Sequence, residues 1–397
     1  MTVFHLRMAR AAVESAGLQF WPLDRVDDED ISRTRTGGLG APAFSGSFRT
    51  VDVIKRRALM VLREGPDAIQ KAGVQALIAD QMDLAVGTVA EHLGLPFVNV
   101  SCGPPLYLEA TAPAPYFGWP HASGRVAQSR NRFGNMLLTW AARPVLRVLN
   151  EQRRLWGLKE LKQLNDAFSR RAIITQLPQV LEFRRPNPPG VVFYTGPFHD
   201  GYSRKRVDFP WDQLNGKPLV YASMGTIRND LPWVFRMIAE ACGSFPLQLV
   251  MSLGAGGIRP RDLGTLPGSP IVVDYAPQLD LIRRSRFVIN CAGLNTVLDC
   301  VSSGVPIVAL PVAEDQPGVA ARVARANIGI VLPLKKLTLR ALMLSIDTIL
   351  HDSTYTLSAR HLQSELAGIQ GLDTAADLVE ERLANHDSTR TLTMKAT

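Results

Sequence analysis

Residues 271–319 decide the fold, and they read IVVDYAPQLDLIRRSRFVINCAGLNTVLDCVSSGVPIVALPVAEDQPGV. Two apolar, β-branched runs in this stretch, Phe287–Asn290 and Pro306–Leu310, end at Gly, Pro or polar residues, which is typical of buried strands. Between them, Leu294–Ser303 carries its apolar residues at helical spacing. The order strand, turn, helix, strand predicts a βαβ unit with two parallel strands.

The turn between the first of these strands and the helix is Asn290-Cys291-Ala292-Gly293. In doubly wound sheets, ligands bind outside the carboxyl ends of the strands, where the following helices begin. The first backbone N–H groups of a helix have no partner inside it and lie at the positive end of its dipole. The turn therefore predicts a site for an anion.

The stretch as a whole resembles the donor-nucleotide signature of the UDP-glycosyltransferase superfamily. In that signature an aromatic residue is followed by x-P-Q, then H-x-G-x-N-[ST], an acidic residue, G-V-P, P and [DE]-Q. The matching residues here are Tyr275, Pro277, Gln278, Gly293, Asn295, Thr296, Asp299, Gly304, Val305, Pro306, Pro311, Asp315 and Gln316. The sequence of this stretch is most similar to that of bacterial enzymes of the zeaxanthin glucosyltransferase and macrolide glycosyltransferase type.

The resemblance implies an α/β fold of the GT-B type, in which two doubly wound Rossmann-like domains face each other across a cleft. We expect an acceptor-binding domain over residues 1–197, a linker over 198–217 and a nucleotide-sugar-binding domain over 218–384. The last helix is expected to cross back onto the N-terminal domain, as in the family. The polar segment 385–397 predicts a disordered tail.

A second turn, Ser223-Met224-Gly225-Thr226, follows the apolar run Pro218–Ala222 and precedes another helical pattern. Small and hydroxylated residues at a helix start suit a phosphate, although such turns also serve as simple helix caps. The resemblance identifies it as the family's diphosphate loop. The expected diphosphate-binding residues are Ser223, Gly225, Thr226, Cys291, Gly293, Asn295 and Thr296.

For the rest of the donor, the resemblance implies that Tyr275 stacks on uracil and that Gln278 and Asp299 reach the ribose. It implies that Asp315 and Gln316 hold the hydroxyls of the sugar. A carboxylate and an amide at neighbouring positions can bind a polyol by several hydrogen bonds. Asp315 also fits a helix N-cap before Pro317, and both roles are compatible.

One position departs from the family pattern, because Cys291 stands where the family has a histidine that donates to the diphosphate. A thiol is a weak donor without positive charge, whereas the lost hydrogen bond would contribute about 1.5–3 kcal/mol. We therefore predict donor binding that is weaker by about tenfold or more, unless Arg283 or Arg284 compensates.

The chain begins with Thr2–Leu6, which resembles the second strand of the family's N-terminal domain. In the family, a first strand, a Gly-His-x-x-Pro loop with the catalytic histidine, and a first helix precede this strand, so we expect an N-terminally truncated domain. Asp80, at the end of the strand Ala76–Ala79, matches the carboxylate that orients this histidine. The alternative for Asp80 is a cap of the next helix. His5 is interpreted as a solvated or core histidine rather than a cleft residue.

Residues 101–140 are rich in Pro and aromatic residues and follow a strand end. Such a segment either forms an apolar cleft wall that faces a flat, lipophilic acceptor, or packs on its own domain. The pattern favours neither alternative. Before it, 27–48 is predicted to be a loop, and Thr50–Gly73 and Gln81–Leu93 are predicted helices.

The chain has 397 residues, 46% of them hydrophobic and 20% charged, which fits an enzyme of two α/β domains. Its net charge of +8 is compatible with nucleic acid, an anionic membrane or an anionic substrate. We expect no nucleic-acid partner, because no basic-aromatic motif of a nucleic-acid module is present. Transient contact with an acidic membrane surface is kept as a hypothesis.

Localisation follows from what the sequence lacks. Its four cysteines have neither metal-ligand nor disulfide spacing, and no run of about 18 apolar residues is present. Met1–Arg10 lacks the apolar core of a signal peptide. We expect a cytoplasmic protein that is at most peripheral to the inner membrane face.

The predicted activity is inverting transfer of a hexose, glucose in the first place, from a UDP-sugar to a hydroxyl of a lipophilic acceptor such as a carotenoid, sterol or polyketide. No metal or cofactor is expected, since a helix terminus can neutralise the leaving diphosphate. The alternative is a non-catalytic nucleotide-sugar-binding remnant or an activator-like partner that lacks the catalytic histidine. A nucleotide-sugar epimerase is disfavoured, because Asn295 and Asp315-Gln316 follow the transferase pattern.

Overall fold

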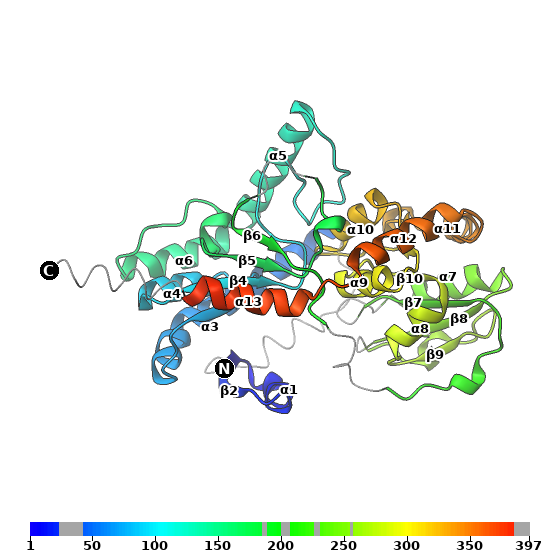
Figure 1. The fold of residues 1–397 in the computed structure, drawn as a ribbon, viewed down its shortest axis with the longest axis horizontal. Coiled ribbons are helices and arrows are strands. Elements are labelled where there is room, and N and C mark those ends of the chain that lie inside the picture. Colours follow the sequence, from blue (N-terminus) through cyan, green and yellow to red (C-terminus); the bar gives the residue numbers. More distant parts are fainter. Residues whose placement is uncertain (24–42, 185–188, 200–206, 226–230, 255–256, 385–397) are drawn as a thin grey trace.

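The computed structural model describes residues 1–23, 43–184, 189–199, 207–225, 231–254 and 257–384, with the backbone alone for 43–49. The described chain forms two α/β halves that lie side by side, each built on a parallel sheet (Figure 1). Thr226 and the segment 385–397 lie outside the described residues, as does most of the predicted loop 27–48.

The C-terminal half holds a six-stranded parallel sheet in the order β12-β11-β10-β7-β8-β9. Its strands are β7 (Leu219–Ser223), β8 (Gln248–Ser252), β9 (Ile271–Val273), β10 (Ser285–Asn290), β11 (Ile307–Ala309) and β12 (Gly329–Val331). Its helices are α7 (Pro232–Gly243), α8 (Gln278–Arg284), α9 (Leu294–Ser302), α10 (Gln316–Arg325), α11 (Leu339–His351) and α12 (Ser353–Leu366). Every residue of β7 and β8 is buried, as expected for central strands covered by helices on both faces.

The predicted βαβ unit is confirmed as β10–α9–β11, with β10 and β11 paired in parallel. The apolar face of α9, formed by Leu294, Val297, Leu298 and Val301, is buried against the sheet. The strand order reverses between β7 and β10, since the chain proceeds from β7 toward β9 and then returns to add β10, β11 and β12 on the other side. Ligand crevices of doubly wound sheets lie at such a reversal.

The N-terminal half holds a four-stranded parallel sheet in the order β3-β4-β5-β6. Its strands are β3 (Leu77–Asp80), β4 (Phe97–Ser101), β5 (Ile173–Thr175) and β6 (Val192–Tyr194). Its helices are α3 (Ala43–Lys71), α4 (Val86–Leu93), α5 (Arg125–Ala141) and α6 (Arg143–Leu155). The first residues form a separate two-stranded parallel sheet, β1 (Thr2–His5) and β2 (Gln19–Pro22), joined by η1 (Arg7–Ala9) and α1 (Arg10–Ser15). Short 3-10 turns complete the chain: η2 (Leu164–Ala167), η3 (Gln179–Leu181), η4 (Trp211–Gln213), η5 (Pro260–Leu263) and η6 (Leu334–Lys336).

Two predicted boundaries in this half are wrong. Helix α3 begins at Ala43 and so takes in the end of the predicted loop, because extending an existing helix adds one hydrogen bond for each residue fixed. Helix α4 begins at Val86 rather than Gln81. The residues before it are held in turns, since the Asp80 side chain accepts from Met82 N and the Gln81 side chain bonds to the backbone of Pro104 and Leu106.

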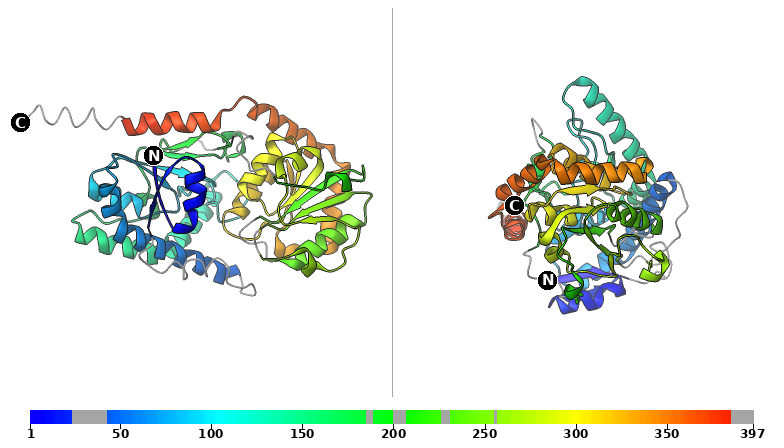
Figure 2. Two further views of the ribbon diagram at one scale, coloured as in Figure 1. Left: turned by 90° about the horizontal axis from the view of Figure 1, so that it is seen from below. Right: turned by 90° about the vertical axis from the view of Figure 1, so that its right-hand side faces the viewer.

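The last helix, α13 (Gly371–Ala384), crosses back onto the N-terminal sheet, as expected (Figures 1 and 2). Ala375 packs against Val98, Ala172 and Ile174 in a small apolar cluster. At its start, a Cβ on Gly371 would come within 2.5 Å of the backbone of Gly196. The last described helix therefore packs on the N-terminal half.

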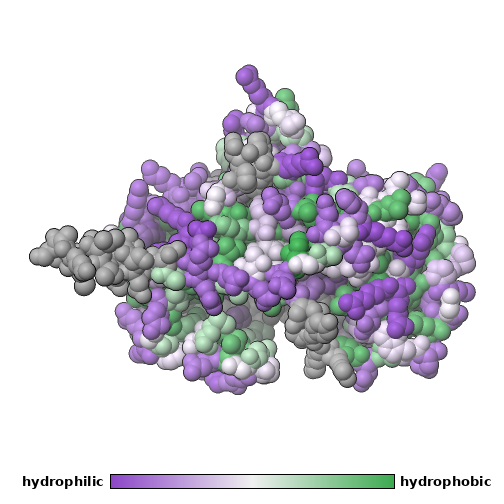
Figure 3. Space-filling view, in the orientation of Figure 1, coloured by the Kyte–Doolittle hydropathy of each residue, from purple (hydrophilic) through white to green (hydrophobic). Residues whose placement is uncertain are grey.

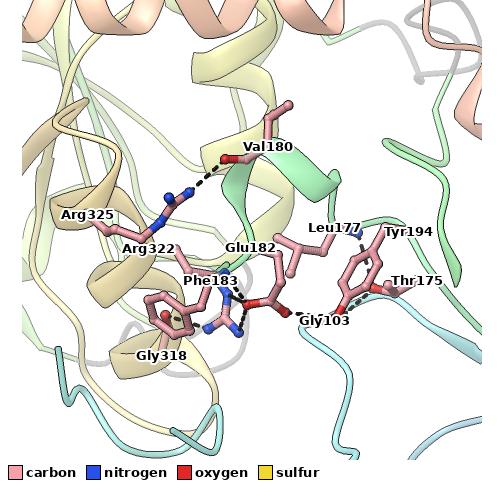
Figure 4. A network of polar contacts seen from close by, with 10 residues as sticks. All are labelled: Gly103, Thr175, Leu177, Val180, Glu182, Phe183, Tyr194, Gly318, Arg322 and Arg325. Carbon is pink, nitrogen blue, oxygen red and sulfur yellow. Dashed lines mark hydrogen bonds and ion pairs between the residues drawn. The ribbon is translucent and has the colours of Figure 1, made fainter. Parts of the chain in front are cut away.

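A buried ion pair joins the two halves (Figure 4). Arg322 on α10 donates to Oε1 of Glu182 from Nε at 3.0 Å and from Nη2 at 2.6 Å, and both side chains are almost fully buried. The guanidinium also lies over the ring of Phe183 at 4.4 Å, and its Nη1 donates to the carbonyl of Gly318. These contacts fix α10 against the N-terminal half.

Candidate functional site

The two predicted phosphate-binding turns are neighbours at one edge of the C-terminal sheet. Strands β7 and β10 pair in parallel with Ser223 opposite Asn290, so the turns that follow them leave the sheet together. A Cβ added to Gly225 would lie 3.2 Å from Sγ of Cys291. The structure thus brings Ser223, Gly225, Cys291 and the start of α9 together, while Thr226 lies outside the described residues.

The turn before α9 is held in one conformation by its own side chains. Ala292 has a left-handed backbone with φ of 60°, and its N–H donates to Oδ1 of Asn290 at 2.7 Å. Gly293 is the N-cap residue of α9, and no side-chain hydrogen bond caps this helix. Because the first N–H groups of α9 receive no such cap, they are placed to bind an anionic ligand at this edge, near Asn295 and Thr296.

The Cys291 thiol is buried at the same edge. Burial raises the pKa of Cys291 to about 11, so the side chain is neutral near pH 7 and carries no charge toward an anion. Neither arginine considered as compensation lies here. Arg283 and Arg284 end α8, which runs back toward the amino ends of the strands, and Arg284 lies over the ring of Trp211 at 4.6 Å.

The residues predicted to bind the nucleoside form a second cluster. Gln278, the first residue of α8, donates from Nε2 to Oδ2 of Asp299 at 2.7 Å. Oδ1 of Asp299 lies 3.3 Å from Nε2 of His199, a contact within ion-pair distance that does not meet hydrogen-bond geometry. Asp299 is completely buried beneath these partners, whereas Tyr275 is 51% exposed. A ribose would therefore meet Gln278 and His199 before Asp299.

Asp315 and Gln316 lie at the start of α10, beside the N-terminal half. Asp315 is the N-cap residue by position, but its side chain makes no capping hydrogen bond. The Gln316 side chain instead holds the loop before the helix, since its Oε1 accepts from the N–H groups of Val312 and Ala313 at 2.9 and 3.1 Å. Burial and the neighbouring Glu314 raise the pKa of Asp315 to about 6. Glu314 itself has a left-handed backbone with φ of 59°.

The N-terminal half closes over this edge. A Cβ on Gly103, in the loop after β4, would lie 2.8 Å from Oδ2 of Asp315. A Cβ on Gly318 would lie 2.0 Å from the carbonyl oxygen of Pro115. Gln176 donates from Nε2 to Oδ1 of Asn295 at 2.7 Å, which links the start of α9 to the end of β5. The two halves therefore meet at the predicted site itself.

Asp80 lies on the N-terminal half, near the same edge. Its negative charge helps to raise the pKa values of Tyr116 and Cys102, although burial is the larger cause for both groups. Tyr116 also lies near Asp315 and Glu314, whose charges act in the same direction. Oδ1 of Asp80 accepts from Met82 N at 2.8 Å, which is the local turn-capping arrangement.

The sequence did not single out three residues that the structure brings into the site. Gln176 follows β5, His199 lies in the predicted linker, and Gly103 follows β4. In the sequence, the only indication of a role for these residues is that each follows a strand. Their contacts join distant parts of the chain, which local patterns do not predict. His5, by contrast, is only partly buried, and its Nδ1 is a buried atom that has no hydrogen-bond partner within the described chain.

Part of the proline- and aromatic-rich segment 101–140 packs on its own domain, which is one of the two expected alternatives, whereas a wall that faces an acceptor stays a prediction. Leu106, Ala112 and Ala114 are buried in the N-terminal half. Pro115 and Gly118 instead approach Pro317 and Gly318 at the start of α10. Within the described ranges, no group of three or more His, Cys, Asp or Glu side chains is arranged to hold a metal ion.

Comparisons of this chain with known protein families, sequences and structures agree with this geometry. The family described as "UDP-glucoronosyl and UDP-glucosyl transferase" matches residues 127–386. The zeaxanthin glucosyltransferase of Pantoea ananas is 30% identical over 351 residues, which cover 88% of this chain and 81% of that protein.

Solved glycosyltransferases share the fold at low identity. The glycosyltransferase of kitacinnamycin superposes with a TM-score of 0.71 at 19% identity, covering 96% of this chain and 91% of that one. The glycosyltransferase VinC, solved in complex with dTDP, gives 0.65 at 17% identity, covering 96% and 92%. These neighbours show the GT-B fold of two facing α/β domains. With the family match over residues 127–386, they lead to one conclusion: the chain belongs to the UDP-glycosyltransferase family and is a glycosyltransferase.

Proposed function

We propose that this glycosyltransferase moves a hexose, in the first place glucose, from a UDP-sugar to a hydroxyl of a lipophilic acceptor such as a carotenoid, sterol or polyketide, with inversion. The observation that carries the proposal is the common edge at which the turns after β7 and β10 meet, opposite the loop at Gly103. The Pantoea ananas relative is named a zeaxanthin glucosyltransferase, which supports glucose as the transferred sugar and an apolar molecule as the acceptor.

In this proposal the diphosphate rests against Ser223 and Gly225 on one side and against Cys291–Asn295 on the other. Free N–H groups and the positive end of α9 stabilise the negative charge that develops on the leaving diphosphate. Tyr275 offers its exposed ring to the uracil, and Gln278 faces the ribose. No metal or cofactor is needed for this step, because the helix terminus supplies the electrostatic stabilisation.

Asp315 and Gln316 would hold the sugar hydroxyls, with the Asp315 carboxylate as acceptor and the Gln316 amide N–H₂ as donor, since its oxygen is already bonded. An inverting displacement needs the acceptor on the side of the sugar opposite the diphosphate. The N-terminal half provides that side, where Asp80 lies. In the family a histidine deprotonates the acceptor hydroxyl, and we assign Asp80 the role of holding that imidazole.

The test combines binding and turnover. Calorimetric titration with UDP, dTDP and GDP should show the tightest binding for UDP. Labelled glucose should pass from UDP-glucose to zeaxanthin dispersed in detergent, and chelators should leave the rate unchanged. Asn295→Ala should weaken UDP binding by about tenfold, because it removes a hydrogen bond to a charged group. Ser302→Ala, at the other end of α9, is the matched control and should have no effect.

The outcomes separate the alternatives. UDP binding that depends on Asn295, without turnover on any acceptor, would support the nucleotide-sugar-binding or activator role instead of catalysis. Preference for dTDP over UDP would support the same donor site but a different donor nucleotide. If no nucleotide binds, or Asn295→Ala and Ser302→Ala bind UDP equally well, the placement of the donor at this edge is wrong.

A further inference from the structure

Helix α5 has an unusual orientation, because its small and polar residues face the protein and its large apolar residues face outward. The buried residues are Ala127, Asn131 and Gly134. The exposed fractions of the large apolar side chains are 86% for Val126, 54% for Phe133, 58% for Met136, 38% for Leu137 and 55% for Trp140. A helix that served only to cover its own domain would place such side chains inward.

Specific contacts fix this orientation. Asn131 donates from Nδ2 to the carbonyl of Ala110 at 2.9 Å, and Asn135 donates to the carbonyl of Glu109 at 2.8 Å. Gly134 lies so close to the ring of Trp119 that a Cβ there would come within 2.7 Å. Turning the helix over would break both hydrogen bonds and press larger side chains onto Trp119, so the apolar face stays outside.

The exposed apolar residues form one continuous surface. Val126, Phe133, Leu137 and Trp140 are separated by seven, four and three positions, which places them on a single face of the helix. We call this set, together with Met136, the α5 stripe. Part of the stripe also lines a hollow of about 740 Å³, whose other wall includes Leu108 and Leu164.

Positive charge surrounds the α5 stripe. The segment 110–150 contains no Asp or Glu and has five arginines, namely Arg125, Arg130, Arg132, Arg143 and Arg147. Arg125 and Arg132 are exposed on the helix itself. The helix projects from the body of the molecule, and hydrophobic and hydrophilic side chains lie close together on the projecting part (Figures 1 and 3).

We propose that α5 is a membrane-interface helix, whose stripe enters the headgroup region of an anionic bilayer while its arginines contact the lipid phosphates. Trp and Phe favour the bilayer interface, and the apolar stems of arginine can lie along it. A second copy of the chain fits less well, because a symmetric pair of α5 faces would bring the arginines of both copies together.

A helix at the membrane surface would let the enzyme reach a lipophilic acceptor where that acceptor is dissolved. This reading of the membrane contact rests on the proposed function. The contact itself involves none of the donor-site residues. No described helix is long and apolar enough to cross a bilayer. The predicted mode is therefore shallow insertion along the surface.

Flotation of the whole protein with vesicles tests the proposal. Binding to equal parts of phosphatidylcholine and phosphatidylglycerol should be stronger by about tenfold or more than binding to phosphatidylcholine alone. Leu137→Ser/Trp140→Ser should weaken it by a similar factor. The matched control is Trp233→Ser/Leu344→Ser, which removes a Trp that is 42% exposed and a Leu that is 65% exposed on α7 and α11.

Charge is tested separately. Arg125→Gln/Arg132→Gln should lose about tenfold in vesicle binding, whereas the exposed pair Arg261→Gln/Arg340→Gln should leave it unchanged. All variants should keep the UDP-induced rise in melting temperature of the wild type, which shows that they fold. If UDP does not raise the melting temperature of the wild type, the proposed function is contradicted, and the vesicle experiment still tests the membrane proposal by itself.

Three outcomes would overturn the membrane proposal. One is equal flotation with neutral and anionic vesicles. Another is equal binding by the stripe variant and its control. The third is self-association of the wild type in light scattering, lost in the stripe variant without any vesicle binding, which would make the α5 stripe a dimer interface.

Discussion

At the scale of single residues, Cys291 departs from the family pattern, which has a histidine at this place. The buried, neutral thiol packs against Gly225, where an added Cβ would lie 3.2 Å from Sγ. Cys291→His should tighten UDP binding by about tenfold or more, because an imidazole N–H can donate to the diphosphate where a thiol donates weakly. Calorimetric titration measures the change.

The control for this variant is Cys291→Ala, which removes the thiol and adds no donor, and its UDP affinity should stay close to that of the wild type. Equal affinities of Cys291→His and the wild type, with unchanged melting temperatures, would show that the diphosphate does not lie next to residue 291.

Asp315 ties donor binding and stability to pH. Because its pKa is raised from 3.8 to about 6, the folded protein binds more protons than the unfolded chain between these values, and its stability falls as pH rises through this window. Asp315→Asn should therefore match the wild type near pH 4 and be more stable above pH 6, by up to about 3 kcal/mol from two pKa units. Urea denaturation at several pH values measures the difference.

The same substitution should lower the catalytic efficiency with UDP-glucose above pH 6, since an amide replaces the carboxylate that we propose accepts from the sugar hydroxyls. The wild-type efficiency should fall as pH drops through about 6, and that fall should be absent in Asp315→Asn. A variant as active as the wild type at pH 8 would remove Asp315 from the sugar site.

The site residues on the C-terminal half were predicted from the resemblance to the family's signature, and the turns after β7 and β10 were expected to lie together because parallel strands bring their carboxyl ends to one edge. The sequence could not predict the contact between Gln176 and Asn295, which lie 119 residues apart in the chain, or the contact between His199 and Asp299. These contacts depend on how the two halves dock. Docking is set by shape and charge over a whole surface rather than by local periodicity.

At the scale of elements, apolar periodicity predicted β10, α9 and β11 well, because these elements are buried and their residue patterns reflect that burial. It predicted the start of α4 poorly, because two hydrogen bonds hold in turns residues that locally favour a helix: Asp80 accepts a local bond from Met82 N, and Gln81 accepts a tertiary bond from Leu106 N. It also could not show that the apolar residues of α5 face outward, because spacing does not reveal which face packs.

The crossing helix α13 offers an element-scale prediction. A Cβ on Gly371 would lie 2.5 Å from the backbone of Gly196 and Pro197, so Gly371→Ala must displace the start of the helix. We expect a loss of about 1–3 kcal/mol in the free energy of unfolding, as for other overpacked sites. Gly190→Ala, whose Cβ would meet open space, should cost far less. Equal urea midpoints for the two variants would contradict this view of the crossing.

At the scale of the whole molecule, the Glu182–Arg322 pair holds the two halves together. Arg322→Leu removes the ion-pair partner of the buried Glu182 carboxylate and should cost about 3–5 kcal/mol in unfolding free energy. The double variant Glu182→Leu/Arg322→Leu should recover much of this loss. The single variant should also increase the radius of gyration in X-ray scattering, because α10 would separate from the N-terminal half.

The exposed pair Arg154 and Glu160, 3.3 Å apart, provides the control for this experiment. Arg154→Leu should change stability by less than about 1 kcal/mol, as is usual for surface pairs. If the double variant is no more stable than Arg322→Leu, the loss arises from packing around Arg322 and not from the broken ion pair.

The left-handed backbone at Ala292 and Glu314 limits how this protein can evolve. A residue with a side chain costs roughly 1 kcal/mol more than glycine in that conformation. Both positions border the edge at which we propose that the sugar nucleotide binds, so two single-codon routes to a more heat-resistant protein pass through the proposed site. Selection for thermal tolerance and selection for turnover would therefore act on the same two codons.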